Sequence, residues 1–315
     1  MRKHIISIYG PTGVGKSDYA LALAQDFPLE IINCDVGQLY TPLSIGTAKP
    51  DWKREKTPHH LFDLLNEPRD YTVVDYRKAV LELCQQVWER NATPVLVGGS
   101  GFYIKSLFFP PLSPEQPEQK ESLPLYEGQT TDALFATLQK LDPIRASQVH
   151  PHDRYRIERA LTLANRAPGT VHTLQPTYHD LGFPYALFCL SRERSELYKR
   201  INERTEKMMD AGWIEEVQGL QKTAWAPFLN RKKLIGYNDI LSFLKDAHDR
   251  KKLVEIIAQK TRHYAKRQMT FWRMLEKELA VHCTSPSIIE QIMITNERTT
   301  YLALKSRIST FLNSL

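Results

Sequence analysis

The segment GPTGVGKS near the N-terminus has the spacing of side chains that is typical of a phosphate-binding loop. Gly10 and Gly15 allow a tight turn whose backbone N–H groups face an anion, and the following helix adds its positive dipole end. Lys16 can neutralise outer phosphate oxygens, and the Ser17 hydroxyl is placed to ligate Mg²⁺. A run of β-forming residues precedes the loop and helix-forming residues follow it, as this motif requires. We therefore predict that the whole loop binds phosphate groups: Gly10, Pro11, Thr12, Gly13, Val14, Gly15, Lys16 and Ser17.

An acidic residue ends the next predicted strand. The segment EIINCD, residues 30–35, is typical of a buried strand and places Asp35 at its carboxyl end. Because the carboxyl ends of parallel strands meet at one edge of a sheet, we expect Asp35 to face the same crevice as the loop. There it could accept a proton from a weak nucleophile, or help to hold Mg²⁺ as in a kinase. These residues alone leave the type of phosphate chemistry open.

Strands and helices alternate through the first third of the chain. This alternation predicts an α/β fold: a P-loop core whose parallel sheet is flanked by helices. The predicted elements are strands at residues 5–9, 30–35 and 59–65, helices at 16–24 and 72–91, and a strand, glycine turn and helix within 93–107.

A proline-rich segment interrupts this pattern. Five prolines lie within residues 108–124, and the pattern from about 130 to 166 is helical and basic. The apolar segment 185–191 then indicates a return to the sheet. We see no chemical signal after about residue 280. The predicted domains are a first part of the P-loop core at 1–112, a helical insertion domain at 113–183, and a return to the core with C-terminal helices at 184–315.

The composition is that of an ordinary globular protein. The chain has 315 residues, is 42% hydrophobic and 25% charged, and carries a net charge of +6, which permits a nucleic-acid partner. The N-terminus leads directly into a strand, and no segment approaches the length of a membrane span. We expect a cytoplasmic monomer without membrane contact, and the widely spaced cysteines are expected to be reduced and mostly buried: Cys34, Cys84, Cys189 and Cys283.

Eight segments, taken in their order, make the chain resemble the tRNA dimethylallyltransferases. The resemblance covers roughly residues 5–280, and the joint pattern is more specific than any one motif. The segments are CDVGQLYTPLSIGTAKP (34–50), PHHLFDLL (58–65), DYTVVDYRKA (70–79), PVLVGGSGFYIKSL (94–107), VHPHDRYRIERAL (149–161), LYKRINERTEKMMDAGWIEEV (197–217), LIGYNDI (234–240) and TRHYAKRQMTFWR (261–273).

This resemblance implies a reaction in which diphosphate leaves as a whole. The loop would bind dimethylallyl diphosphate together with Mg²⁺ at Ser17, and an adenosine beside the tRNA anticodon would attack with its exocyclic amine. Asp35 matches the family's base, Arg204 matches an arginine at the diphosphate, and Arg200 lies one helical turn before it. Ser100 stands where the family usually has threonine. The implied catalytic residues are Asp35, Lys16, Ser100 and Arg204.

The resemblance also implies a surface for tRNA. Cations would contact phosphates, and bases that leave their stack can lie on aromatic rings. We expect base flipping of the target adenosine, because it must reach the recessed Asp35. The residues expected to contact tRNA, the insertion's contact with the anticodon loop included, are Asp35, Val36, Gly37, Gln38, Ser100, Gly101, Tyr155, Arg156, Arg159, Lys233, Gly236, Tyr237, Lys266 and Arg267.

Three other functions fit parts of this pattern. An adenylate-type isopentenyltransferase would share the loop and Asp35 and would not need the basic C-terminal helices. A P-loop small-molecule kinase would share the loop. A non-catalytic RNA-binding relative is suggested by Val36 and Gly37, where the family usually has a small polar residue and often arginine.

Overall fold

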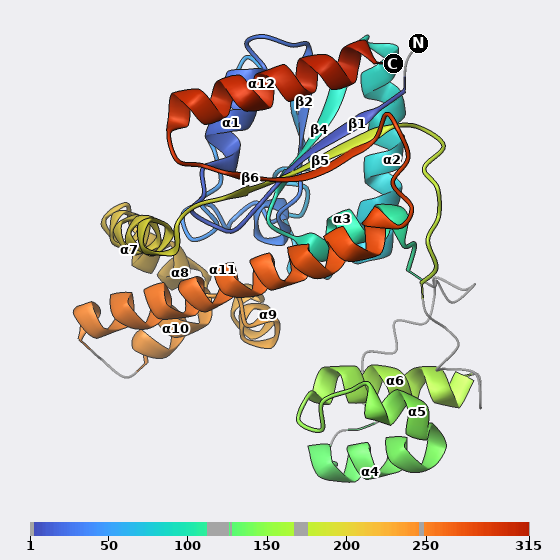
Figure 1. Cartoon of the computed structure of the whole chain (residues 1–315). Coiled ribbons are helices and arrows are strands. Elements are labelled where there is room, and N and C mark those ends of the chain that lie inside the picture. The colour runs from blue at the N-terminus through green and yellow to red at the C-terminus, as the bar shows by residue number, and fades with distance from the viewer. Residues whose placement is uncertain (1–2, 112–125, 127, 167–175, 246–248, 315) are drawn as a thin grey trace. The chain divides into compact units, whose positions relative to one another are not determined.

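The computed structural model describes residues 3–111, 126, 128–166, 176–245 and 249–314. The chain divides into two compact units, whose elements are drawn in Figure 1. Met1–Phe108 and Asp180–Leu315 form the first unit, and Phe109–His179 forms the second.

One parallel sheet carries the first unit. In the part of the chain that the structure describes, six strands pair in the order β3-β2-β4-β1-β5-β6. Tyr9 of β1 pairs with Gly98 of β4 and with Cys189 of β5, so the carboxyl ends of these strands meet at one edge. The strands are β1 Ile5–Tyr9, β2 Leu29–Asn33, β3 His59–His60, β4 Thr93–Gly98, β5 Tyr185–Ser191 and β6 Ile288–Met293.

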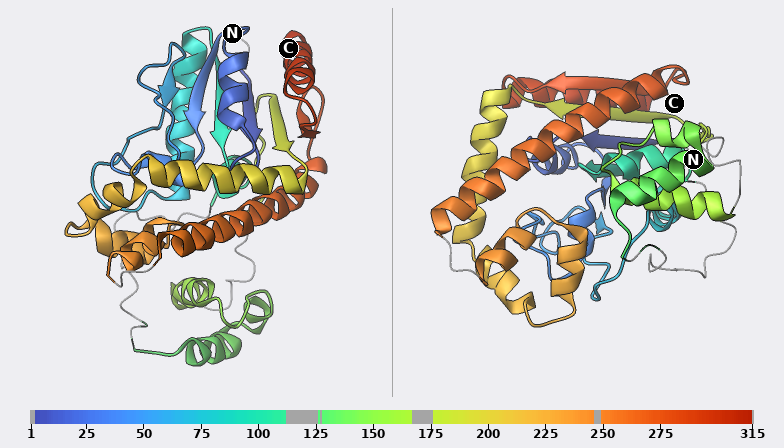
Figure 2. Two further views of the ribbon diagram at one scale, coloured as in Figure 1. Left: turned by 90° about the vertical axis from the view of Figure 1, so that its left-hand side faces the viewer. Right: turned by 90° about the horizontal axis from the view of Figure 1, so that it is seen from below.

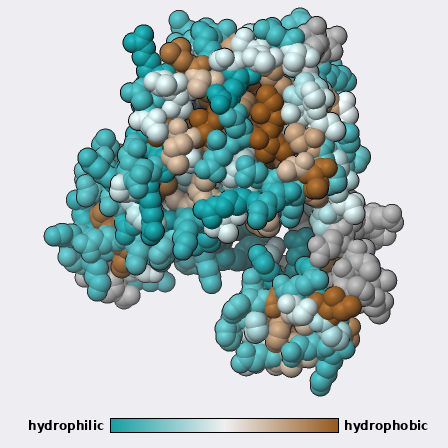
Figure 3. Space-filling model, viewed as in Figure 1, coloured by the Kyte–Doolittle hydropathy of each residue, from teal (hydrophilic) through white to brown (hydrophobic). Residues whose placement is uncertain are grey.

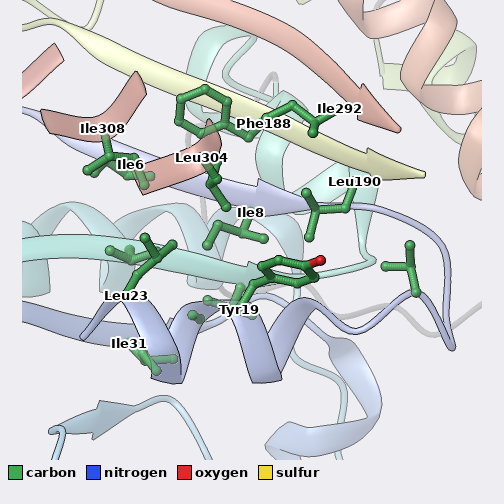
Figure 4. Close-up of a cluster of buried hydrophobic side chains, with 14 of the residues drawn as sticks. Ile6, Ile8, Tyr19, Leu23, Ile31, Phe188, Leu190, Ile292, Leu304 and Ile308 are labelled. Carbon is green, nitrogen blue, oxygen red and sulfur yellow. The ribbon is translucent and has the colours of Figure 1, made fainter. Parts of the chain in front are cut away.

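Helices cover both faces of this sheet. Helices α1 (Lys16–Leu23) and α12 (Glu297–Asn313) pack on one face, and α2 (Val73–Glu89) and α3 (Gly101–Phe108) lie on the other (Figure 1). The core below α1 and α12 is apolar because alternate residues of the strands point into it. Figure 4 shows this cluster: Ile6, Ile8, Tyr19, Leu23, Ile31, Phe188, Leu190, Ile292, Leu304 and Ile308.

A group of helices lies beyond the carboxyl ends of the strands. Helices α7 and α11 contact each other there, and the right view in Figure 2 shows them crossing at an angle. Tyr9 at the end of β1 stacks on Trp272 of α11, with ring centroids 5.7 Å apart. This contact fixes the long helix against the sheet edge. The helices are α7 Arg194–Asp210, α8 Trp213–Leu220, α9 Trp225–Lys232, α10 Tyr237–Phe243 and α11 Arg250–Ala280.

The second unit is a small helical body. It contains α4 (Thr131–Leu141), α5 (Pro143–Ser147) and α6 (Arg154–Arg166), which share a core around Leu138 and Ile157. The insertion expected at residues 113–183 begins and ends later than this unit. Most of the proline-rich segment falls on residues 112–125, outside the described residues.

The α/β fold with a parallel sheet is confirmed. Thr72 caps α2 as expected, and its Oγ1 accepts a hydrogen bond of 3.1 Å from the Asp75 N–H group. The strand expected at 59–65 was too long, because Leu61 and Asp63 have φ values of 60° and 50° and the backbone turns after β3. The prediction found neither β6 nor α12. Cys34, Cys84 and Cys189 are buried and, with the half-buried Cys283, free.

Within the described residues, no helix combines the length and apolarity needed to cross a bilayer.

Candidate active site

Four loops meet at the carboxyl-end edge of the sheet. They follow β1, β2, β4 and β5, and they carry the phosphate loop, Asp35, Ser100 and Arg192 respectively. Ligands bind at this edge in open α/β sheets, because adjacent loops there diverge and leave a crevice.

Glycines shape the phosphate loop. Gly13 and Gly15 have φ values of 83° and 107°, a region that side-chain-bearing residues rarely adopt. The Lys16 ammonium donates hydrogen bonds to the carbonyl oxygens of Gly10 (3.1 Å) and Pro11 (3.0 Å). The ammonium therefore already lies over the loop, where it can meet an anion.

Two guanidinium groups hold the carbonyl oxygens of the same loop. Arg192 Nε donates to Val14 O, and Arg200 Nε donates to Gly13 O, both at 2.9 Å. Arg200 was expected beside Arg204 on one helix face. In the structure, its Nε atom in addition contacts the carbonyl oxygen of Gly13 in the phosphate loop.

Gln268 of α11 joins the phosphate loop to the turn after β4. Its side chain is 4% exposed. Gln268 Oε1 accepts from the Thr12 N–H group at 2.9 Å, and Nε2 donates to Gly99 O at 2.8 Å. The Tyr9 hydroxyl donates to Gln268 O at 2.8 Å. The Thr12 N–H group is therefore occupied by Gln268, and Thr12 lines the cavity beside the loop.

Asp35 caps a short turn instead of ending a strand. Strand β2 ends at Asn33, and the Gly37 N–H group donates to Asp35 Oδ1 at 3.1 Å at the start of the 3₁₀ turn η1 (Val36–Leu39). The Val36 N–H group donates to Ser100 Oγ at 3.2 Å. Ser100 therefore holds the turn that orients the Asp35 carboxylate, which lines the cavity as predicted.

A cavity of about 280 Å³ lies against these groups. Its polar wall contains Thr12, Asp35, Ser100 and Arg204. The combination suits a ligand with an anionic head and a hydrocarbon part. Apolar and aromatic side chains make up much of the remaining lining: Ile201, Met208, Trp213, Leu234, Ile235, Tyr237 and Tyr264.

Trp213 fills a slot between two glycines. A Cβ atom at Gly46 would stand 2.1 Å from the indole, and one at Gly236 would stand 2.0 Å from it. Both glycines are needed for this close approach. The indole thus forms a fixed part of the cavity wall.

The charged groups at the polar wall influence each other. Burial lowers the pKa of Lys16 to about 8, an effect that Asp35 opposes and Arg204 reinforces. Burial raises the pKa of Asp35, with Lys16, the Gly37 N–H group and Arg204 acting in the opposite direction. Burial also lowers the pKa of Arg204, and Asp35 again opposes it. The carboxylate and the two cations therefore form one electrostatic cluster.

The structure brings half of the residues expected to contact tRNA to this cavity. Gln38 has a different position, since its Nε2 donates to Thr47 O at 3.1 Å within the loop after β2. Gly101 packs under Phe271, where a Cβ would stand 2.3 Å from the ring. The expected residues that line the cavity are Asp35, Val36, Gly37, Ser100, Lys233, Tyr237 and Arg267.

A more open groove of about 540 Å³ runs along α11. Lys266 lines this groove, and Arg267 lines both the groove and the cavity. Phe271 also lines it, and its ring lies 4.8 Å from that of Phe102, which is 61% exposed. Figure 3 shows hydrophilic residues along the outer side of α11.

Three expected tRNA contacts lie on α6 of the second unit. Tyr155, Arg156 and Arg159 are exposed there, and Arg156 pairs with Asp153 at 3.2 Å.

Sequence reasoning missed Gln268 and Arg192. A signal existed for both. Gln268 is a polar residue on the buried face of α11, in register with Ala265, Trp272 and Leu275. Arg192 directly follows β5, at the same edge that singled out Asp35.

The side chains around the phosphate loop fit a Mg²⁺ ion held mainly by substrate and water better than a metal site made only of protein ligands. Within the described residues, no group of three or more His, Cys, Asp and Glu side chains is placed to hold a metal ion. Mg²⁺ is commonly held by one or two protein groups plus substrate phosphates and water. The exposed hydroxyl of Ser17, at the start of α1, could be such a ligand.

A profile of the IPP transferase family matches residues 38–275. The chain belongs to this family. A curated relative named tRNA dimethylallyltransferase, from Alkaliphilus metalliredigens, is 34% identical over 305 residues, which cover 93% of this chain and 97% of the relative. The predicted family and its prenyltransferase class are confirmed.

Solved IPP transferases share the architecture. The chain resembles the full-length tRNA isopentenylpyrophosphate transferase of Bacillus halodurans at 25% identity and a TM-score of 0.68, covering 99% and 97% of the two chains. It resembles the tRNA isopentenylpyrophosphate transferase of Staphylococcus epidermidis at 26% identity and 0.66, covering 100% of both chains. The IPP transferase profile includes Ser100, Arg204 and Gln268, whereas Asp35 precedes the matched segment.

Proposed function

We propose that this IPP transferase moves a dimethylallyl group from dimethylallyl diphosphate to the exocyclic amine of the adenosine on the 3′ side of the tRNA anticodon. The main support for the proposal is the cavity beside the phosphate loop, which is lined by Asp35, Arg204 and apolar side chains. A charged wall next to an apolar one is what this donor requires. The names of the relatives support tRNA as the acceptor.

The reaction breaks the allylic carbon–oxygen bond and forms a carbon–nitrogen bond. Diphosphate leaves with the bonding electron pair, and Lys16 and Arg204 stabilise its growing charge. The adenine amine is a weak nucleophile, so Asp35 accepts its proton as the new bond forms. The raised pKa of Asp35 improves its match to a base working near neutral pH.

Ser100 and Ser17 have supporting parts in this proposal. Ser100 holds the backbone turn that orients Asp35, through the Val36 N–H group. Ser17 and oxygens of the donor would hold Mg²⁺, which when bound would add positive charge at the leaving diphosphate.

The acceptor is held outside the cavity while one base enters it. A cavity of about 280 Å³ is too small for a folded RNA loop, so the target adenosine leaves its stack to reach Asp35. Lys266 and Arg267 on the exposed side of α11 would contact phosphates near the cavity. The exposed Arg156 and Arg159 of the second unit would contact the anticodon loop, together with Tyr155.

We also infer a monomer in the cytoplasm. The free cysteines of the chain fit a reducing compartment.

The test offers labelled dimethylallyl diphosphate and Mg²⁺ to the enzyme with unmodified tRNA or with AMP, and in a third reaction offers ATP with either acceptor. We predict that the label is transferred to tRNA and that the rate of transfer to AMP is at least about a hundredfold lower, which corresponds to about 2.7 kcal/mol of discrimination. We predict no phosphoryl transfer from ATP. Equal transfer to AMP would favour the free-nucleotide alternative, and phosphorylation by ATP would favour a kinase.

A further inference from the structure

We propose that Arg192 and Arg200 are positioning residues that hold the phosphate loop in its anion-binding shape, and that Glu297 of α12 holds Arg192 in place. The inference rests on the proposed function, because the ligand of the loop is taken to be the donor's diphosphate. It assigns a part in donor binding to the C-terminal helix.

The two arginines set the orientation of two peptide groups. Arg192 Nε holds Val14 O, and Arg200 Nε holds Gly13 O, each at 2.9 Å. In a planar trans peptide the N–H group points opposite to the carbonyl group. Drawing Val14 O toward Arg192 therefore turns the Gly15 N–H group away from it, toward the inside of the loop. Such inward N–H groups bind anions.

Both guanidinium groups also lie close behind the loop. An NH2 nitrogen of Arg192 lies 3.6 Å, and one of Arg200 3.8 Å, from where a Cβ of Gly15 would stand. Two positive charges at this position add to the attraction that the loop exerts on a diphosphate. Gly15 cannot readily carry a side chain because its φ value is 107°.

Arg192 is held by acidic partners on two helices. Its side chain is 4% exposed, and a buried guanidinium requires acceptors for its N–H groups. NH1 donates to Glu196 at 2.6 Å, and NH2 donates to Glu297 at the first position of α12. The other carboxylate oxygen of Glu297 accepts from the Tyr19 hydroxyl of α1 at 2.6 Å.

A continuous set of contacts thus runs from α12 to the phosphate loop. The match to the family profile ends at residue 275, and Glu297 lies 22 residues beyond it. The Glu297 side chain is 61% exposed, so replacing it leaves the core intact. Weakening this contact should free Arg192 and disorder the Val14 peptide group.

The main experiment compares Glu297→Gln with Glu290→Gln in the full-length enzyme. Glu290 of β6 pairs with Arg307 of α12 at 2.6 Å, so its replacement removes another ion pair of α12 without touching Arg192. The probe is inorganic diphosphate with Mg²⁺, measured by calorimetry, followed by steady-state kinetics. We expect Glu297→Gln to weaken diphosphate binding and raise KM for the donor by on the order of tenfold, with KM for tRNA unchanged. Glu290→Gln should match wild type in both.

A second pair of variants tests the other arginine. Arg200→Lys keeps the charge but lacks the planar Nε donor to Gly13, and it should also weaken diphosphate binding. Arg194→Lys on the same helix, whose guanidinium lies 5.1 Å from the Tyr198 ring centroid, is its control.

Three outcomes are informative. Diphosphate affinities that are the same in Glu297→Gln and Glu290→Gln would overturn the inference while leaving the proposed function intact. Parallel rises in KM for donor and tRNA would do the same, because they would indicate general loosening. Failure of the wild type to bind diphosphate would contradict the proposed function, and the inference with it.

Discussion

The replacement Gln268→Met removes one buried and one partly buried hydrogen bond at nearly constant side-chain volume. It leaves the Thr12 N–H group and the Gly99 carbonyl group without the partners that Gln268 provides at 2.9 and 2.8 Å. A buried backbone group that loses its partner costs about 1–3 kcal/mol. The buried Gly99 carbonyl group gives a loss of about 1–3 kcal/mol in the free energy of unfolding, to which the partly buried Thr12 N–H group adds less. This loss is a sizeable part of the roughly 5–15 kcal/mol typical of a domain.

Urea unfolding of the full chain, followed by tryptophan fluorescence, measures this loss. Met269→Leu is the matched control, because Met269 is the half-buried neighbour on α11 and makes no such bridge. We expect the control to lose less than about 1 kcal/mol. A loss below about 1 kcal/mol for Gln268→Met, with an unchanged denaturant slope, would refute the reasoning, because the two backbone groups would then have found other partners.

Three further predictions follow from the same site. The single-turnover transfer rate should fall as pH falls through the pKa of Asp35, since only the ionised carboxylate accepts a proton; burial raises that pKa, so the decline should begin above the usual aspartate range, and a flat profile in wild type would exclude Asp35 as the base. Replacing Lys266 and Arg267 by alanine should weaken tRNA binding and flatten the plot of log affinity against log salt by roughly one unit per lost phosphate contact; an intact slope in a salt titration would show that these cations do not touch the RNA. Trp213→Leu shortens one wall of the cavity, so the kcat/KM ratio of geranyl to dimethylallyl diphosphate should rise; no change in the ratio would place the prenyl chain elsewhere.

Local patterns explain what the sequence could predict. The phosphate loop and Asp35 each follow a strand that is mostly apolar and fully buried. Because the carboxyl ends of parallel strands meet at one edge of a sheet, the sequence could predict that both lie at one cavity. The cap of α2 was also readable, because Thr72 and Asp75 satisfy each other's backbone within four residues. These features depend on neighbours in the chain.

Long-range contacts explain what it could not predict. β6 is an edge strand, and only Ile292 among its six residues is buried, so its apolar pattern is weak. Gln268 and Thr12 are 256 residues apart, and Arg192 and Glu297 are 105 apart. No local pattern indicates such partners. The contact of Arg200 with the Gly13 carbonyl group was missed for the same reason, since helix spacing places Arg200 near Arg204 and gives no indication of the loop.

Product analysis of one reaction tests the central claim most directly. Wild-type enzyme is incubated with dimethylallyl diphosphate, Mg²⁺ and unmodified tRNA, and the tRNA is digested and analysed by mass spectrometry while inorganic diphosphate is measured. We predict a dimethylallyl group on the adenosine 3′ to the anticodon, equimolar release of diphosphate, and a rate roughly 10²- to 10⁴-fold lower for Asp35→Asn with tRNA binding unchanged. Unmodified tRNA, or prenylation at a near-normal rate by Asp35→Asn, would contradict it.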